Sequence, residues 1–136
     1  MNRIGKITVR VEADVNPTED PDKVRISILK VMGDLQLETV EEGGTYRLIG
    51  KGEGAESLAK FQELLRRERI LDAARKVLFK GLHGDTVIFY LNRQVAYVGH
   101  ISFSQNVGES PLGPIKVEVQ CEEPRMVIEW LAPRTR

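Results

Sequence analysis

The segment "DTVIFYLNRQVAYVGHISFS", residues 85–104, contains the strongest strand pattern in the chain and indicates the fold class. Its first part alternates with the period of two that places one set of side chains, Val87, Phe89 and Leu91, on a buried face. A short turn near Asn92-Arg93 leads into a second apolar run. We therefore expect a hairpin of two antiparallel strands whose second strand presents one apolar face, formed by Val95, Tyr97, Ile101 and Phe103.

The flanking segments predict further strands and helices. Residues 4–13 and 115–121 alternate like half-buried strands, and the two runs around "EEGG" at 41–44 read as another hairpin. Asp20 as N-cap, Pro21 at the first position and Gly33 as the stop delimit a helix. The segment "PRMVIEWLAP" predicts a short terminal helix.

A long helical segment is expected from about residue 56 to 80, interrupted by "RRER" at 66–69. The spacing does not distinguish one bent helix from two helices with a tight junction. The order of elements predicts an α+β fold of two layers, a mainly antiparallel sheet with helices packed on one face. The length fits a single domain, 1–136.

The glycine-rich stretch Gly50–Ala55 matches G-x-G-x-x-A, a form of the dinucleotide-binding fingerprint. That fingerprint requires a parallel strand–helix–strand unit, which the order of elements does not provide. The suitably spaced acid, Asp72, also falls inside a helix. No nucleotide cofactor is expected, and the glycines are interpreted as a mobile connector. A narrower alternative is that Lys51 and a free helix start hold one anion.

Charge is balanced over the whole chain but not along it. Twenty basic residues match twenty acidic ones, which counts against strong RNA or DNA binding. Residues 57–93 nevertheless hold eight basic side chains against four acidic ones. A modest basic face is therefore expected in this region.

Five arginines are the candidate RNA-binding residues, since guanidinium groups at helical spacing can meet a phosphate backbone. They are Arg66, Arg67, Arg69, Arg75 and Arg93. The competing interpretation, which we favour, is a solvated helix face on which the arginines pair with neighbouring acids, namely Glu63, Glu68 and Asp72.

Exposed aromatic residues on a sheet could also stack bases. Alternation instead favours a core position for most of Phe89, Tyr90, Tyr97 and Phe103.

The sequence gives little support for a catalytic function. The candidates at loops or strand ends are Glu109, Ser110, His100 and Cys121, and no nucleophile elbow, H-E-x-x-H pattern or paired carboxylates accompany them. Two histidines and one cysteine make a poor metal-ligand set, so neither a metal nor another cofactor is expected. No apolar run could span a membrane, and a cytoplasmic location is the default expectation.

Several phrases together resemble one uncharacterised archaeal protein family: "EDPDKV" (19–24), "ILDAAR" (70–75), "FYLNRQVAYVG" (89–99), "ESPLGPI" (109–115) and "WLAP" (130–133). Relatives typically read K-Q-A-A where this chain has Arg93-Gln94-Val95-Ala96. The resemblance implies a fold similar to the large-subunit ribosomal protein that holds 5S RNA, and a homodimer. Family members have been linked to RNA binding because of that fold, but no binding residue carries over.

The leading interpretation is a non-enzymatic archaeal cytosolic protein, associated with RNA. A dimeric protein-assembly module without RNA is the alternative, with apolar strand or terminal-helix surface around Trp130 buried between subunits. An enzyme of unknown reaction is a second alternative, and it requires a polar pocket at Ser110 and His100.

Overall fold

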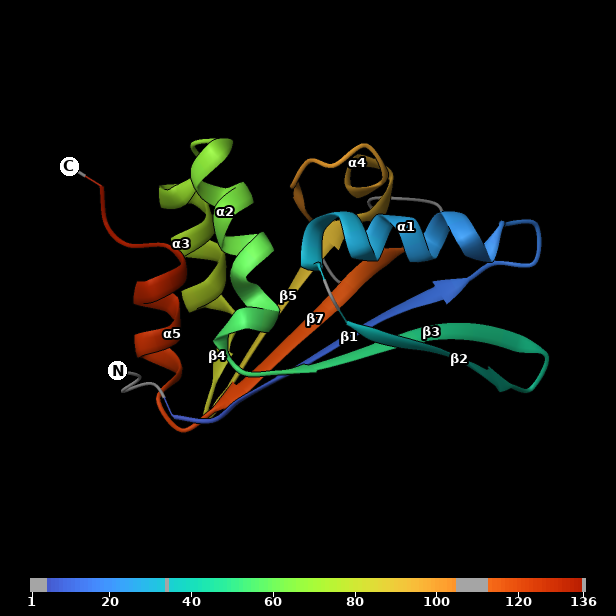
Figure 1. Ribbon diagram of the computed structural model, residues 1–136, viewed down its shortest axis with the longest axis horizontal. Coiled ribbons are helices and arrows are strands. Elements are labelled where there is room, and N and C mark those ends of the chain that lie inside the picture. Colours follow the sequence, from blue (N-terminus) through green and yellow to red (C-terminus); the bar gives the residue numbers. More distant parts are fainter. Residues whose placement is uncertain (1–4, 34, 105–112, 136) are drawn as a thin grey trace.

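The computed structural model describes residues 5–33, 35–104 and 113–135. Its central feature is a seven-stranded sheet, and every strand pair in these residues is antiparallel (Figure 1). The spatial order is β2-β3-β1-β7-β5-β4, and β6 pairs with β5 off this path. The strands are β1 (Ile7–Val15), β2 (Gln36–Glu42), β3 (Thr45–Glu53), β4 (Leu82–His83), β5 (Thr86–Asn92), β6 (Phe103–Ser104) and β7 (Pro114–Cys121).

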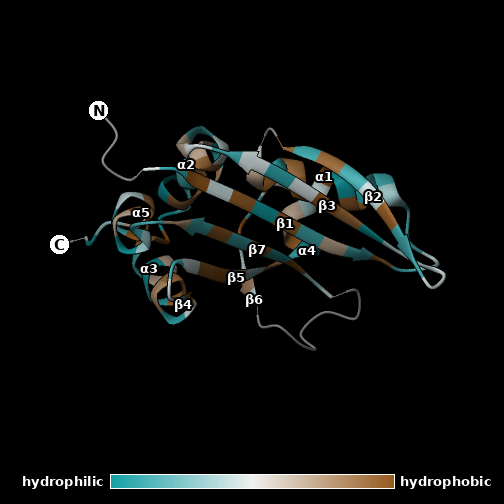
Figure 2. Cartoon of the chain, turned by 90° about the horizontal axis from the view of Figure 1, so that it is seen from below, coloured by the Kyte–Doolittle hydropathy of each residue, from teal (hydrophilic) through white to brown (hydrophobic). Residues whose placement is uncertain are grey.

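The helices lie on one face of this sheet (Figure 1). They are α1 (Pro21–Met32), the 3₁₀ turn η1 (Ala55–Leu58), α2 (Ala59–Arg67), α3 (Leu71–Lys80), α4 (Arg93–Tyr97) and α5 (Pro124–Leu131). One end of the sheet is covered by α1 and α4, and the other by α2, α3 and α5. Seen from below, the opposite face of the sheet is uncovered (Figure 2). The predicted two-layer α+β fold is confirmed.

The core forms between the helices and the covered face of the sheet. The register sets Val9 against Val119 and Val11 against Val117, and all four side chains are buried. Their alternation with half-buried polar neighbours is the period-two pattern that the sequence shows. An aromatic cluster of Phe61, Phe89 and Phe103 joins α2 to β5 and β6, with ring centroids 5.1–6.4 Å apart.

The first predicted helix is confirmed together with both of its ends. The carboxylate of Asp20 accepts a hydrogen bond from the backbone N–H of Asp22 at 2.9 Å, as an N-cap does. At the other end Gly33 has φ +76°, which a residue with a side chain rarely adopts. The hairpin of β2 and β3 and the terminal helix α5 also form where they were expected.

The predicted second strand of the 85–104 hairpin is wrong over residues 93–97, which form the short helix α4. The side-chain oxygen of Asn92 accepts a hydrogen bond from the backbone N–H of Val95 at 3.0 Å and so begins a helical turn. Only Phe103–Ser104 returns to pair with β5. The core position expected for Tyr97 is therefore wrong, and its side chain is exposed.

The glycine stretch is not a mobile connector. Gly50 and Gly52 lie inside β3, which pairs with β1 on one side and β2 on the other. A Cβ at Gly50 would lie 2.6 Å from Leu37 Cδ2, and one at Gly52 would lie 2.9 Å from Ser57 Cβ. Glycine is favoured at both positions because side chains of neighbouring segments pack directly against the backbone of the strand.

The helical region after β3 is two helices and not one bent helix. The break falls at residues 68–70, and Arg69 there has a positive φ of 59°. The N–H of Ile70 bonds the carbonyl of Leu65 across this junction at 3.2 Å. Within the described residues, no helix has both the length and the apolar composition needed to cross a membrane.

Candidate functional site

The two layers carry charge of opposite sign. The five α-helices hold eleven basic and four acidic side chains, a formal charge of +7, whereas the strands hold four basic and seven acidic ones, a formal charge of −3. The helical charges are Lys23, Arg25, Lys30, Lys60, Arg66, Arg67, Arg75, Lys76, Lys80, Arg93 and Arg125 against Asp22, Glu63, Asp72 and Glu129. The strand charges are Arg10, Arg47, Lys51 and Lys116 against Glu12, Asp14, Glu38, Glu41, Glu42, Glu53 and Glu118. The neutral total therefore conceals a basic excess on the α-helices, part of which is offset by acids at their caps and connections, such as Glu19, Asp20 and Glu68.

Two basic side chains of the uncovered sheet face, Arg10 and Arg47, have acidic partners on that same face. Arg10 Nε lies 3.2 Å from Glu12 Oε2, and Arg47 Nε lies 3.3 Å from Asp14 Oδ1. Acidic residues thus neutralise this face from within. It offers a phosphate backbone less attraction than the helical layer does.

Three of the predicted arginines lie together and exposed at the end of α2 and the junction after it. They are Arg66, Arg67 and Arg69. The nearby acids bond elsewhere: Glu68 bonds His100 and the N–H of Ile101, and Asp72 bonds the hydroxyl of Thr135. We call Arg66, Arg67 and Arg69 the junction arginines. Their position is compatible with the predicted phosphate contact.

Arg75 is engaged with the terminal helix. Its Nη1 and Nη2 bind the two carboxylate oxygens of Glu129 at 2.7 and 2.6 Å, and Nη1 also donates to the carbonyl of Ala132 at 3.2 Å. The pKa of Glu129 is lowered by this hydrogen-bonded pairing. The guanidinium lies 5.0 Å from the centre of the Phe79 ring. Arg75 therefore joins α3 to α5.

Arg93 is buried, so the prediction that it forms part of an exposed basic face is wrong. Only 2% of its side chain is exposed, and its Nη1 lies 2.9 Å from Glu19 Oε2. The same nitrogen donates to the carbonyl of Asp14 at 2.6 Å, and Nε donates to that of Gly113 at 3.1 Å. Arg93 ties α4 to the end of β1 and to the turn before α1.

Lys51 does not lie beside a helix start. Its neighbours across the sheet are Arg10 on β1 and Gln36 on β2. The adjacent Gly52 faces the helical layer, where a Cβ would meet Ser57. Because successive residues of a strand face opposite sides, Lys51 projects from the uncovered face. The structure therefore separates the two parts of the predicted anion site.

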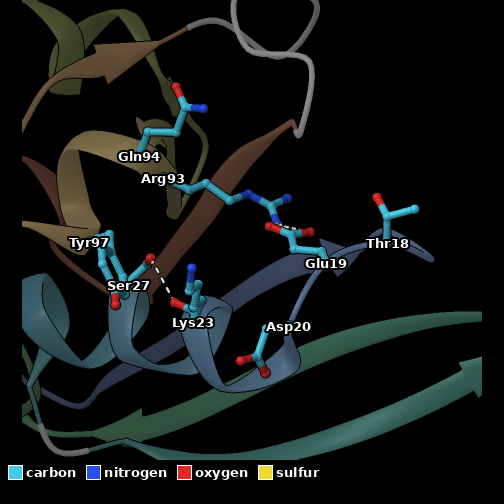
Figure 3. A pocket seen from close by; sticks show the side chains of 8 residues that line it. All are labelled: Thr18, Glu19, Asp20, Lys23, Ser27, Arg93, Gln94 and Tyr97. Atoms are coloured by element: carbon cyan, nitrogen blue, oxygen red, sulfur yellow. Dashed lines mark hydrogen bonds and ion pairs between the residues drawn. The ribbon is translucent and has the colours of Figure 1, made fainter.

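A pocket of about 430 Å³ lies between α1 and α4 (Figure 3). Ser27 is a buried residue of its lining, and its hydroxyl donates to the carbonyl of Lys23 at 2.9 Å. The ion pair of Arg93 and Glu19 forms another part of the wall. The full lining is Thr18, Glu19, Asp20, Lys23, Ser27, Arg93, Gln94 and Tyr97.

Tyr97 is the exposed aromatic residue of this pocket, and two lysines of α1 flank it. Lys23 Nζ lies 6.0 Å and Lys30 Nζ lies 5.9 Å from the centre of the Tyr97 ring. Both distances fall within the range of cation–π attraction. Tyr97 is 37% exposed, so part of the residue is accessible to a ligand. An accessible aromatic ring between cations is a typical component of sites that bind nucleic acids.

The sequence did not single out this arrangement. Lys23 and Lys30 are seven residues apart on α1 and so lie on one helix face, which is a signal present in the sequence. Tyr97 joins them only because residues 93–97 form a helix. The signal for that helix was Asn92, a residue favoured as an N-cap.

The predicted catalytic candidates do not assemble into a site within the described residues. Glu109 and Ser110 lie outside those residues. His100 Nδ1 lies 2.6 Å from Glu68 Oε2, and Cys121 is buried, which raises the pKa of its thiol. Among the described residues no three His, Cys, Asp or Glu side chains group as metal ligands would.

The fold and charge together define a two-layer α+β protein with a basic helical layer. Residues 8–121 match a family model described as RNA binding. The chain is 43% identical over 125 residues to a UPF0201 protein of Metallosphaera sedula, across 92% of this chain and 87% of the relative. Identity to a UPF0201 protein of Pyrococcus horikoshii is 41% over 128 residues, across 94% and 91%.

The crystal structure of the UPF0201 protein from Methanococcus jannaschii superimposes with a TM-score of 0.84, at 38% identity and with 95% of each chain covered. The chain therefore belongs to the UPF0201 family, which occurs in many archaea. The archaeal family predicted from the quoted motifs is confirmed.

Proposed function

We propose that the protein binds RNA through its helical layer. The observation that carries the proposal is the separation of charge, +7 on the α-helices and −3 on the strands. Contacts between basic side chains and phosphates supply most of the non-specific affinity for nucleic acids. The family model's description, RNA binding, supports the same class of ligand.

Two groups on the helical layer supply the contacts in this proposal. The junction arginines, exposed around the end of α2, contact phosphates directly. Lys23, Lys30 and Tyr97 form the second group on α1 and α4. Arg75 and Arg93 have a different role, because their ion pairs hold the helices that carry these groups in place.

Cross-linking in cells tests the proposal and captures the bound RNA in the same experiment. The protein is irradiated in its native archaeal cells, purified under denaturing conditions and digested, and RNA-linked peptides are mapped. The proposal predicts cross-links on peptides from α1, α2 and α4. Cross-links confined to β1, β3 and β7, or no RNA at all, would contradict it.

The homodimer implied by the resemblance remains a separate expectation. RNA binding by the helical layer leaves the uncovered sheet face free for contact with a second copy. Light scattering at micromolar concentration measures the mass in solution. A monomer there would rule out the dimer and would leave the RNA proposal unaffected.

A further inference from the structure

The charges that line the α1–α4 pocket cancel. Lys23 and Arg93 contribute two positive charges, and Glu19 and Asp20 contribute two negative ones. Each acid already has a partner, since Glu19 binds Arg93 and Asp20 caps α1. A phosphate placed inside would meet two carboxylates. An uncharged polar ligand fits this lining better than an anion does.

The pocket provides a surface on which a flat ring can stack. Tyr97 is partly exposed, and every nucleobase has a π-face that can pack against an aromatic side chain. Lys23 Nζ and Lys30 Nζ lie over this ring, each about 6 Å from its centre, so a base that stacks there displaces the two ammonium groups toward its own phosphates. The neutral lining suits the uncharged base of a nucleotide, and the nearby lysines suit its phosphates.

Polar groups of the pocket can recognise the edge of such a base. Gln94, on the same helix as Tyr97, has an exposed side chain that carries both a hydrogen-bond donor and an acceptor. The volume of about 430 Å³ falls in the range usual for small-ligand sites. The buried pair of Arg93 and Glu19, which forms part of the wall, fixes the position of α4.

We infer that this pocket receives one unstacked nucleobase of a single-stranded RNA. The inference rests on the proposed function and makes it more specific. Bases inside a duplex are stacked and paired, so such a pocket excludes them and selects single-stranded segments. The protein therefore prefers single-stranded to double-stranded RNA, and Tyr97 is the residue that produces the preference.

The test uses single-stranded RNA oligonucleotides that contain 2-aminopurine, whose fluorescence is quenched when it stacks. The wild-type protein quenches the signal. Tyr97→Phe keeps the ring and retains quenching and affinity. Tyr97→Ala loses the quenching and weakens single-strand binding by about fivefold or more. Tyr46→Ala, at an exposed tyrosine of β3, is the matched control and leaves both unchanged.

The outcomes separate this inference from the proposed function. Equal affinity for single and double strands, with no effect of Tyr97→Ala, overturns the pocket assignment while RNA binding stands. No binding of any RNA at about 50 mM salt overturns both. If adenosine alone binds as tightly as the oligonucleotide, the pocket is not a subsite for RNA. Thermal unfolding of each variant verifies that the fold is intact.

Discussion

Arg93 and Glu19 form a buried ion pair, 2.9 Å from Nη1 to Oε2, between residues that are 74 positions apart in the sequence. Glu19 is itself held by the backbone N–H and the side-chain amide of Asn16, at 3.1 and 3.2 Å. The pair joins α4 to the turn before α1, directly beside the pocket. The position of Tyr97 therefore depends on a buried ion pair between two distant parts of the chain.

Removing one partner of this pair is expected to destabilise the protein strongly. Arg93→Met leaves the Glu19 carboxylate buried without its cation, and such losses typically cost about 3–5 kcal/mol in the free energy of unfolding. Urea denaturation at neutral pH measures the change. Arg10→Met, which breaks a partly exposed pair on β1, is the matched control and should cost less than about 1 kcal/mol. Equal losses of the free energy of unfolding in the two variants would contradict the stabilising role of the pair of Arg93 and Glu19.

Gly81→Ala is expected to be the most damaging of the glycine substitutions. A Cβ at Gly81 would overlap the backbone carbonyl oxygen of Ile88, and the paired strand cannot move away. We expect a loss of about 3 kcal/mol or more in the free energy of unfolding. Gly50→Ala is the comparison, since its new Cβ meets the flexible end of Leu37, and should cost about 1 kcal/mol. A milder effect at Gly81 than at Gly50 would refute this account of the packing.

The pair of Glu68 and His100 predicts a pH-dependent contribution to stability. Partial burial raises the pKa of Glu68, but hydrogen bonds from His100 and the Ile101 N–H outweigh it, so the pKa lies below its ordinary value of 4.5. A lowered pKa in the folded state means stability that is present above about pH 4.5 and lost as the pH falls through the folded-state pKa.

Glu68→Gln should therefore reduce the free energy of unfolding by about 1.5 kcal/mol at pH 6. The difference from wild type should shrink as the pH is lowered toward 3. Thermal or urea unfolding across this range measures it, with Glu63→Gln on α2 as the control for loss of an exposed carboxylate. If the difference in the free energy of unfolding between wild type and Glu68→Gln grows toward low pH, the pKa of Glu68 is not lowered in the folded protein.

Asn92→Ala tests the link between the cap of α4 and binding. The variant loses the hydrogen bond to the Val95 N–H, which should cost about 1 kcal/mol of stability and loosen the helix that carries Tyr97. Asn92→Ser can cap the same helix and should restore both stability and RNA affinity. If Ser and Ala behave alike in fluorescence anisotropy with labelled RNA, the cap does not position Tyr97.

Local signals were sufficient to predict much of the fold. The ends of α1 follow from Asp20 and Gly33, and the buried faces of the long strands follow from alternation. Residues 93–97 were misassigned because Val95 and Tyr97 also fit a strand pattern, and only tertiary contacts decide between the two structures. The roles of Gly50 and Gly52 depend on segments packed against β3.

The candidate site was predictable only in part. An excess of basic residues between 57 and 93 pointed to the junction arginines, which are exposed. The same count included Arg75 and Arg93, whose partners, Glu129 and Glu19, lie 54 and 74 positions away. No local pattern identifies such partners. Tyr97 and its flanking lysines meet through packing of α1 against α4, which the sequence does not reveal.

The central claim is that RNA binds to the helical layer and not to the sheet. Fluorescence anisotropy with a single-stranded RNA, measured over a range of salt concentrations, tests it on two triple variants. One reverses the junction arginines to Glu, and the other reverses Arg10, Lys51 and Lys116 on the uncovered sheet face.

The first variant should lose most of the affinity. The slope of the logarithm of its binding constant against the logarithm of the salt concentration should become shallower by about 0.7 for each phosphate contact removed. The second variant should bind like the wild type, apart from a small long-range effect of its changed net charge. If the sheet variant loses the affinity and the variant at the junction arginines keeps it, the helical layer is not the RNA-binding surface.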